Sequence, residues 1–444
     1  MDQRASAIDT CFWKIGREAR TPNSPVTGEI RVDVAIIGAG FTGLSTAYHL
    51  MSADPSLDVA VLEGETIGFG ASGRNGGFVM TLFGSSVALM KLLHGKERVR
   101  QANDYMERCI DELDALVRQH AIDCDWRRTG FLRMATTPAY EKRIRDEMAF
   151  LASLGIHGLE WKDRDWVQAR VASPKFLAAC WEPACGSLNP IKWVDGLERI
   201  AMAAGARIHE RSPVTGIEHE AGGYRLNTPG GTVRANKIVY ATNGYTHLIP
   251  GMRLRQTPAF AYIVVTEPLN PEQLASIGWQ GREAIEDGRN FMHFFRLTPD
   301  NRILAGGGPG LVPFGGNMDH DTYAKAFAHL EKFVNDMFPA LGGVRIAHRW
   351  GGAFSATADF TPAIGTMDGG RAAYSFGCTG HGVAMTHMNG QILRDLVLER
   401  KTELTEQWFV NRFTMPMPPE PIRSAAIRTV MGAMALDDWW CDRG

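Results

Sequence analysis

The sequence predicts a mixed α/β protein with two units, one built on a largely parallel sheet and one on an antiparallel sheet. Three observations support this prediction. A buried strand, a glycine turn and a helix follow one another near the amino terminus, a second such unit lies near the carboxyl terminus, and segments of alternating polarity lie between them. Two strand–turn–helix units so far apart suit one long ligand that lies across a discontinuous domain.

The composition is that of an ordinary globular protein. Of the 444 residues, 45% are hydrophobic and 22% are charged, with a formal net charge of −2, so the chain can bury a core of about two or three domains. Basic residues are spread along the chain, so we expect no nucleic-acid partner. The first twenty residues lack the apolar run of a signal peptide or membrane span, so we expect a cytoplasmic protein without a transmembrane segment.

Seven cysteines lie along the chain without CxxC spacing. Cys180 and Cys185 have four residues between them, and no histidine cluster lies nearby. We therefore expect buried, free thiols and no metal site.

The stretch "VDVAIIGAGFTGLSTAYHL" predicts a buried strand at residues 34–37 followed by a helix. Gly38, Gly40 and Gly43 have GxGxxG spacing, and a second strand, "DVAVLEG", ends in Glu63, twenty residues after Gly43. The glycines allow a pyrophosphate to approach the helix N-terminus, and the carboxylate can accept hydrogen bonds from ribose hydroxyls. The sequence therefore predicts a Rossmann-like nucleotide-binding unit.

Residues 68–77, "GFGASGRNGG", hold five glycines around one cation, Arg74. Glycines let backbone amides approach a ligand without interference from Cβ atoms, and the arginine can offset charge. An ordinary flexible loop is the alternative, but it does not explain an arginine and an asparagine held between glycines.

The middle of the chain predicts scaffold helices and strands. Helical spacing of apolar residues predicts an amphipathic helix at 97–120, and a charged helical segment lies at 139–154. Hairpin strands flank the turn at 229–231, and a strand at 237–241 follows. Residues 255–310 alternate as in a sheet, a helix follows near 322–338, and a final strand, a glycine turn at 377–382 and a helix run to about residue 400.

Four motifs together resemble the D-amino-acid oxidase and glycine oxidase superfamily of FAD enzymes. They are the GxGxxG unit with Glu63, the "GASGRNGG" loop, the "VYATNG" strand end and the "GCTGHGV" turn. The resemblance covers nearly the whole chain. Within the superfamily, "GFGASGRNGG", "FRLTPDNRILAGGG", "TGHGVAMTH" and the tail after Pro419 are most similar to the gamma-glutamylputrescine oxidase-like bacterial amine oxidoreductases.

The resemblance implies a domain organisation. A discontinuous FAD-binding domain takes residues 29–95, 190–246 and 345–400, and a substrate-binding domain built on an antiparallel sheet takes 96–189 and 247–344. An N-terminal extension of residues 1–28 and a C-terminal tail of residues 401–444 flank them. The implied FAD is non-covalent, because relatives of the sarcosine oxidase type attach flavin through a cysteine upstream of the second turn, and none lies between Cys185 and Cys378.

The same resemblance implies where FAD is bound. The loop at 68–77 would pass along the pyrophosphate and ribityl chain, and the helix near His381 would point its positive end at the flavin. His381 either faces the cofactor or caps the turn. The implied FAD-binding residues are Gly38, Gly40, Phe41, Thr42, Gly43, Glu63, Gly64, Ser72, Gly73, Arg74, Asn75, Gly76, Gly77, Val214, Ala241, Thr242, Gly244, Gly380, His381, Gly382 and Val383.

The implied reaction is hydride transfer from the amine-bearing carbon of a small amine to flavin N5, giving an imine that water hydrolyses, with O2 as acceptor. The implied substrates are gamma-glutamylputrescine-like amines, N-methyl amino acids or aminophosphonates. A dehydrogenase with another electron acceptor is the alternative, because no positive group near N5 is evident. A nicotinamide-dependent reductase or a non-catalytic nucleotide-binding subunit would leave the turn at 377–382 unexplained.

At the expected substrate-binding residues, the sequence differs from that of the amino-acid oxidases. Phe354 stands about where they place a carboxylate-binding arginine, so a simple α-amino acid lacks its partner. The candidate catalytic or substrate-wall residues are Tyr262, His293, Arg296 and His381. Strand alternation sends His293 and Arg296 to opposite faces, so only one of them can line the pocket, and core packing is the alternative for the aromatic residues. An anionic tail would need a cation, and Arg296 and Arg302 are the candidates.

Overall fold

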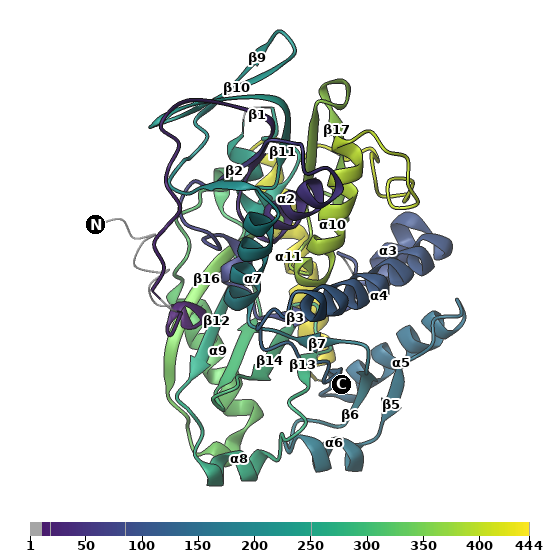
Figure 1. The fold of residues 1–444 in the computed structure, drawn as a ribbon. Helices are drawn as coiled ribbons and strands as arrows, with labels where there is room; N and C mark the ends of the chain where they lie inside the picture. Colours follow the sequence, from purple (N-terminus) through teal and green to yellow (C-terminus); the bar gives the residue numbers. More distant parts are fainter. Residues whose placement is uncertain (1–10, 18, 85, 250, 444) are drawn as a thin grey trace.

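The computed structural model describes residues 11–17, 19–84, 86–249 and 251–443. In this part of the chain, two eight-stranded sheets form the framework, and helices pack around them (Figure 1). The predicted mixed α/β class is confirmed. The first ten residues of the predicted N-terminal extension lie outside the described residues.

The first sheet is largely parallel and contains both predicted strand–turn–helix units. Its strand order is β17 (Ala363–Met367), β18 (Ala372–Phe376), β11 (Gly231–Tyr240), β1 (Gly28–Ile37), β2 (Val59–Leu62) and β8 (Arg207–His209), with β10 (Gly223–Thr228) and β9 (Gly216–Glu220) added beside β11. Parallel pairing joins β18, β11, β1, β2 and β8. Strand β2 and the last residues of β1 and β11 are continuous buried apolar runs, as expected for parallel strands that are covered on both faces.

Three helices stand side by side on this sheet. They are α7 (Pro190–Ala203), α2 (Phe41–Ala53) and α10 (Gly382–Val397), with α2 between the other two and against β1 and β2 (Figure 1). Parallel strands end at one edge, so the turns that lead into α2 and α10 lie close together. This edge is where open α/β sheets bind ligands.

The second sheet is antiparallel except for one pair of strands. Its order is β16 (Ile346–Ala356), β12 (Thr257–Thr266), β15 (Ile303–Gly307), β14 (His293–Leu297), β13 (Ala284–Asp287), β4 (Phe131–Ala135), β6 (Ala178–Glu182) and β5 (Glu160–Lys162). Among the described residues of this sheet, only β13 and β4 pair in parallel. Helix α9 (Ala324–Met337) buries its apolar side on one face, against Tyr262 and Phe295.

The described chain contains further α-helices and a small sheet. They are α3 (Val87–His94), α4 (Lys96–Gln119), α5 (Pro138–Ala152), α6 (Arg164–Arg170), α8 (Pro271–Ile277), α11 (Ile422–Cys441) and the two-stranded sheet of β3 (Phe78–Val79) with β7 (Gly186–Ser187). The predicted helix at 97–120 is α4, and that at 139–154 is α5. The predicted tail contains α11, which spans from one sheet toward the other (Figure 1).

Two segments lie elsewhere than the predicted domain boundaries place them. Helix α4, expected in the substrate-binding domain, packs on α10, and the Tyr105 hydroxyl donates to Oδ1 of Asn389 at 2.8 Å. Strand β16, expected in the FAD-binding domain, pairs with β12 of the second sheet. An amphipathic pattern identifies the buried face of an element but not its packing partner. The remaining domain boundaries stay a prediction.

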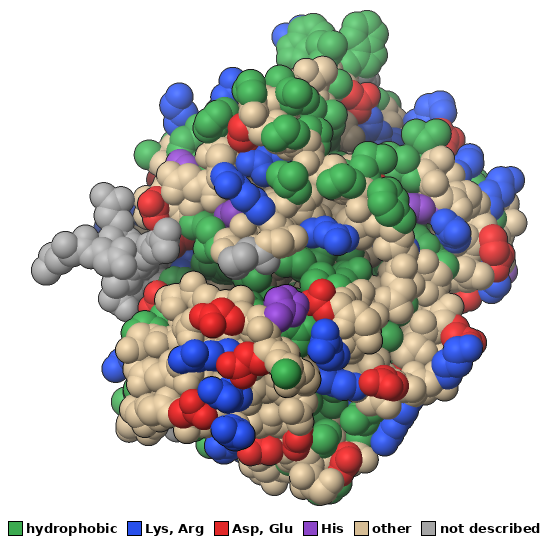
Figure 2. Space-filling model, turned by 90° about the horizontal axis from the view of Figure 1, so that it is seen from above, with side chains coloured by type: hydrophobic (Ala, Val, Ile, Leu, Met, Phe, Trp, Pro, Cys, Tyr) green, Lys and Arg blue, Asp and Glu red, His purple; other side chains and the backbone are tan. Residues whose placement is uncertain are grey.

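The seven cysteines are free, as predicted; six are buried and Cys378 is half-buried. Within the described ranges, no helix combines the length and the apolar character needed to cross a membrane. Among the same residues, no three His, Cys, Asp or Glu side chains gather where they would hold a metal ion. On the face seen in Figure 2, basic and acidic side chains are interspersed, and hydrophobic side chains line a central hollow.

Candidate active site

A cavity of about 830 Å³ lies between the two sheets. It brings together the first glycine turn, the loop at 68–77, the end of β11 and the second glycine turn, which are far apart in the sequence. The predicted FAD-binding residues that line it are Gly40, Phe41, Thr42, Ser72, Arg74, Asn75, Gly76, Ala241, Gly380, His381, Gly382 and Val383. The other predicted residues do not line it: Gly38, Gly43, Glu63, Gly64, Gly73, Gly77, Val214, Thr242 and Gly244.

The first turn requires glycine for two different reasons. Gly38 has a φ of +104°, and a Cβ there would lie 2.7 Å from the carbonyl oxygen of Ala241. A Cβ on Gly43 would lie 1.9 Å from the carbonyl oxygen of Gly38. Any side chain would therefore force the strand and helix apart, and with them the backbone amides at the start of α2.

Glu63 fixes the same turn from the neighbouring strand end. Its Oε2 accepts a hydrogen bond from the backbone N–H of Ala39 at 2.8 Å, and its Oε1 accepts one from that of Glu65 at 3.1 Å. Burial raises the pKa of Glu63, and the two N–H groups oppose the rise. Each carboxylate oxygen has a second lone pair, so Glu63 can still accept a ribose hydroxyl.

The glycine-rich loop is held in one conformation by its own side chains. Ser72 Oγ accepts from the backbone N–H of Phe41 at 2.9 Å, which ties the loop to the start of α2. The Asn75 amide donates to the carbonyls of Ala71 and Ser72, and its Oδ1 accepts from the N–H of Gly77. These bonds explain why the asparagine is needed, and they argue against the flexible-loop alternative.

Two indoles secure the loop from outside. Trp13, in the N-terminal extension, donates from Nε1 to the carbonyl of Asn75, and Trp350 of β16 donates to that of Arg74, both at 2.8 Å. Because these two carbonyls accept hydrogen bonds from indoles on the outer side of the loop, the other side of the loop is free to face the cavity. The loop is thus rigid backbone that is prepared for a ligand.

Arg74 is buried at the cavity wall and is not a free charge. Its Nη1 forms an ion pair with Oδ1 of Asp321 at 2.7 Å, and its Nε donates to the carbonyl of Phe69 at 2.8 Å. Its Nη2 is buried without a partner in the described chain. Arg74 therefore offers a hydrogen bond to the cavity rather than a net charge. Asp321 belongs to no motif, and sequence reasoning missed it.

The second turn presents His381 to the cavity as the residue before α10. Its side chain makes no capping hydrogen bond to the helix, but it interacts with the backbone of Thr379 within the turn, so the turn-capping alternative stays open. Burial lowers the pKa of His381 to about 4, against the opposing effect of the Gly84 backbone. The imidazole is therefore neutral at physiological pH, and α10 points its N-terminal end at the cavity.

The cavity wall contains polar atoms that need a ligand. Arg74 Nη2, Thr257 Oγ1 and Thr386 Oγ1 are buried without a hydrogen-bond partner among the described residues, and all three residues line the cavity. Buried polar atoms rarely stay unpaired in native proteins. Together with the glycine turns and the helix N-termini, they fit a long ligand with phosphates at one end and a polar ring at the other, as FAD has.

Tyr262 and His293 do not line the cavity, so they are not supported as substrate-wall residues. Tyr262 is fully buried under α9, and its hydroxyl donates to the carbonyl of His320 at 3.0 Å. His293 Nδ1 bonds Oδ2 of Asp287 at 2.7 Å, and its ring stacks on Phe333. Both side chains face α9, on the side of the sheet away from the cavity, whereas Phe294 faces the cavity.

Arg296 is also off the cavity, although it lies on the same strand face as Phe294. Its Nη1 donates to the carbonyls of Leu188 at 2.9 Å and Gly77 at 3.2 Å, and its guanidinium lies over the ring of Trp13. Burial lowers its pKa to about 10. Arg296 supports the glycine-rich loop from behind and is not available for an anionic tail.

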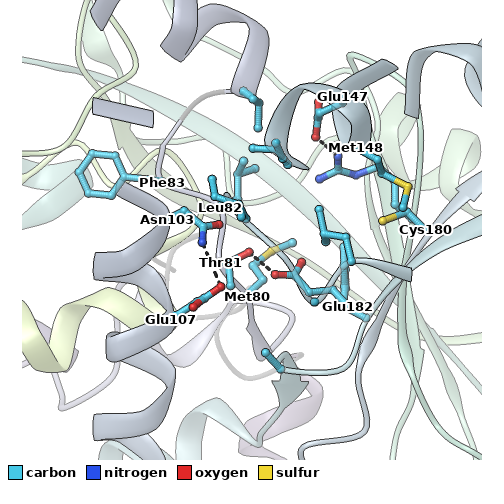
Figure 3. A pocket seen from close by; sticks show the side chains of 18 of the residues that line it. Met80, Thr81, Leu82, Phe83, Asn103, Glu107, Glu147, Met148, Cys180 and Glu182 are labelled. Atoms are coloured by element: carbon cyan, nitrogen blue, oxygen red, sulfur yellow. Dashed lines mark hydrogen bonds and ion pairs between the residues drawn. The ribbon is translucent and has the colours of Figure 1, made fainter. Parts of the chain in front are cut away.

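A smaller cavity of about 130 Å³ adjoins the main one and shares part of its wall: Met80, Leu82, Val87, Phe131, Arg133, Ile144 and Glu147. Arg133 is ion-paired with Glu147 and with Glu286. Thr81 donates to Glu182 at 2.6 Å, and burial raises the pKa of that carboxyl (Figure 3). The shared wall therefore combines apolar chains with a paired arginine.

Residues 33–396 match the family model described as FAD dependent oxidoreductase. The chain belongs to this family of FAD-dependent oxidoreductases. It is therefore an enzyme, and its cofactor is FAD; non-covalent attachment stays a prediction from the sequence. The residues around the two turns and the loop are those that would hold it.

Two relatives of this FAD-dependent oxidoreductase align over most of their length. Gamma-glutamylputrescine oxidoreductase of Escherichia coli (strain K12) is 31% identical over 388 residues, which are 87% of this chain and 88% of the relative. The probable oxidoreductase OrdL of Rhizobium meliloti (strain 1021) is 30% identical over 435 residues, 95% of this chain and 96% of the relative. The predicted superfamily and subgroup resemblance is thereby confirmed.

Among solved structures, glycine oxidase from Geobacillus kaustophilus superposes with a TM-score of 0.72 at 21% identity, over 86% of this chain and 99% of that one. L-proline dehydrogenase from P. horikoshii superposes with a TM-score of 0.71 at 20% identity, over 88% and 97%. At this identity the likeness shows the fold.

Sequence reasoning also missed a whole wall of the oxidoreductase's cavity. Helix α11 and the segment before it line one side, and the loop between β13 and β14 lines the adjoining side. The tail has no glycine or charge motif, and its methionines gave the only signal. Their recurrence at helical spacing marks one apolar face, but it does not show what that face meets.

Proposed function

We propose that this enzyme oxidises the carbon–nitrogen bond of a small amine with no carboxylate on the reacting carbon, such as gamma-glutamylputrescine or a related polyamine derivative, with O2 as electron acceptor. One observation supports this substrate class. Every arginine lining the cavity is already ion-paired within the described chain. The pairs are Arg74 with Asp321, Arg133 with Glu147 and Glu286, Arg143 with Asp437, Arg289 with Asp287 and Asp442, and Arg423 with Glu420.

An α-amino acid needs a bidentate cation for its carboxylate, and the wall offers none that is unpaired. Phe354 lines the cavity about where the resemblance predicts an arginine in amino-acid oxidases. N-methyl amino acids and aminophosphonates are disfavoured for the same reason, because their anionic group lies next to the reacting amine and would be buried there without a partner, whereas the carboxylate of gamma-glutamylputrescine lies at the far end of its chain. The name of the relative at 31% identity, gamma-glutamylputrescine oxidoreductase, agrees with this amine class.

The protein's part in the reaction is to bind, orient and desolvate the amine. Phe291, Met292, Phe294 and Phe354 form an apolar wall. Such a wall disfavours an ammonium ion, so it lowers the pKa of the bound amine and favours the neutral form with a free lone pair. Bound FAD would supply the acceptor for the hydride of the amine-bearing carbon, and water would hydrolyse the imine product. Neutral His381 and the free Nη2 of Arg74 orient polar groups without adding charge.

Oxygen is the proposed acceptor, and a non-oxygen carrier is the second candidate. The ion pairing of the cavity's arginines favours this second candidate. A cation that is neutralised by a carboxylate stabilises less well the negative charge that develops when oxygen is reduced. Whether the reduced enzyme reacts with air decides between them.

The experiment is a spectrum of the purified protein followed by anaerobic titration with amines. We expect flavin bands at roughly 370 and 450 nm, bleaching by gamma-glutamylputrescine, and no bleaching by glycine or N-methylglycine at the same concentration. Admission of air should restore the bands and release hydrogen peroxide. Bleaching by amino acids alone would overturn the substrate class, and failure of air to restore the bands would assign the enzyme to the dehydrogenases.

A further inference from the structure

We infer that the C-terminal helix α11 is the specificity wall of the substrate cavity and that it selects amines carrying an apolar chain. This inference deepens the proposed amine oxidation and rests on it for the identity of the reacting group. The α11 residues that line the cavity are Arg423, Ala426, Ile427, Val430, Met431 and Met434. Their spacing places them on one side of the helix.

A single buried carboxylate, Asp438, fixes both α11 and the adjoining cavity wall. Its Oδ1 accepts from the backbone N–H of Asn290 at 2.8 Å and from the Asn290 amide at 3.0 Å, and its Oδ2 accepts from the backbone N–H of Phe291 at 3.0 Å. Asn290 and Phe291 both line the cavity. The helix therefore sets the shape of the loop between β13 and β14 as well as its own face.

Other polar contacts hold the two ends of α11. Asp437 is ion-paired with Arg143 at 2.6 Å, and Asp442 with Arg289 at 2.7 Å. At the other end, Oε1 of Glu420 accepts from the backbone N–H of Gly315 at 3.1 Å. The segment between these anchors spans the cavity, so its side chains, rather than its backbone position, decide what fits against it.

The span from Ile427 to Met434 presents only apolar side chains to the cavity. The adjoining wall is also apolar, with Phe291, Met292 and Phe294. Thioether chains adapt their shape to a flexible alkyl group. A chain of methylene groups between these walls gains affinity by burial, by about fourfold for each buried CH2 group. The chemical class selected is thus an amine with an extended aliphatic segment.

The test measures binding of ethylamine, butylamine and hexylamine to the FAD-loaded enzyme by anaerobic calorimetry. In the unmodified enzyme we expect the dissociation constant to fall steadily with chain length. Met434→Ala should weaken hexylamine binding by about tenfold and leave ethylamine within about twofold. The matched control is Leu436→Ala on the same helix, whose side chain is 65% exposed and does not line the cavity. It should leave all three constants unchanged.

Asp438→Asn tests the role of Asp438 in positioning α11 and the loop between β13 and β14. Asp437→Asn, the same change at the adjacent residue, is the control. We expect Asp438→Asn to reduce the ratio of hexylamine to ethylamine affinity while the flavin spectrum stays unchanged, and Asp437→Asn to have a smaller effect. If Asp438→Asn does not fold, the Met434→Ala series still decides.

Calorimetry measures amine binding, and flavin bleaching measures amine oxidation. The inference about α11 and the proposed function can therefore fail independently. If Met434→Ala leaves the hexylamine-to-ethylamine ratio unchanged, or Leu436→Ala changes it as much, the inference is overturned even when amines bleach the flavin. If the unmodified enzyme binds no amine, it is overturned too. If chain-length selection depends on Met434 but no amine bleaches the flavin, the inference stands and the proposed oxidation fails.

Discussion

Arg74 and Asp321 form a buried ion pair across the two units, with Nη1 of the arginine 2.7 Å from Oδ1 of the aspartate and side-chain exposures of 3% and 9%. Arg74 belongs to the glycine-rich loop, and Asp321 lies just before α9. The pair therefore joins the loop expected to bind the cofactor to the sheet expected to bind the substrate. Both charges are removed from water, so each depends on the other.

Asp321→Ala should lower the free energy of unfolding by roughly 3 to 5 kcal/mol, because the guanidinium is left buried and uncompensated. Urea denaturation of the FAD-loaded protein measures the change. Asp146→Ala is the control, since it breaks an exposed pair with Lys142 and should cost about 0 to 1 kcal/mol. Equal losses in the two variants would contradict the role assigned to the Arg74–Asp321 pair.

Gly43→Ala should abolish retention of FAD. Its Cβ would lie 1.9 Å from the carbonyl oxygen of Gly38, so the turn must open and the amides at the start of α2 must move. The measurement is flavin absorbance after desalting. Gly432→Ala on α11 is the control, because a Cβ there meets nothing within 4 Å, and this variant should stay yellow. A yellow Gly43→Ala protein would show that the turn is not part of the cofactor site.

The sequence allows a prediction of the cofactor side because its signals are local. Gly38, Gly43 and Glu63 lie within one strand–turn–helix–strand unit, where spacing alone determines the geometry. The loop around Arg74 was recognised for a similar reason. The partner of Arg74 was not, because Asp321 is distant in the sequence and its position follows from how α9 packs on the second sheet.

The substrate side shows the limit of the same reasoning. Alternation along β14 correctly separated His293 from Phe294, but the face that meets the cavity depends on which side α9 covers. Arg296 shares the cavity-side face and is still excluded from the cavity, because the strand runs on beneath the loop at Gly77. Such outcomes depend on tertiary packing that no local pattern encodes.

His387 should make the protein less stable in mild acid. Burial, and secondarily the charge of His120, lower the pKa of His387 to about 4. The unfolded chain takes up a proton near pH 6.5 that the folded state refuses until about pH 4. The stability contributed by the neutral ring is therefore complete above about pH 6.5 and is lost as the pH falls toward 4, by roughly 1 to 3 kcal/mol.

Replacement of the imidazole tests this linkage. In His387→Phe, the free energy of unfolding from urea titrations should fall less steeply between pH 6.5 and 4 than in the unmodified protein. His157, which is exposed, provides the control, and His157→Phe should leave the pH dependence unchanged. An identical slope for His387→Phe and the unmodified protein would contradict the prediction.

Arg296→Met should destabilise the protein without changing its preference among amines. The guanidinium donates to the carbonyls of Gly77 and Leu188. Its loss leaves the carbonyl of Leu188 buried without this donor, at a cost of roughly 1 to 3 kcal/mol, whereas the carbonyl of Gly77 still accepts from the backbone N–H of Leu188. Because the side chain does not line the cavity, the dissociation constants of hexylamine and N-methylglycine should each stay within about twofold of those of the unmodified enzyme. The control is Arg302→Met. Arg302 is the other candidate cation and does not line the cavity either, so this variant should also leave both dissociation constants unchanged. A selective loss of N-methylglycine binding in Arg296→Met, with urea stability unchanged, would restore Arg296 as the substrate's cationic partner.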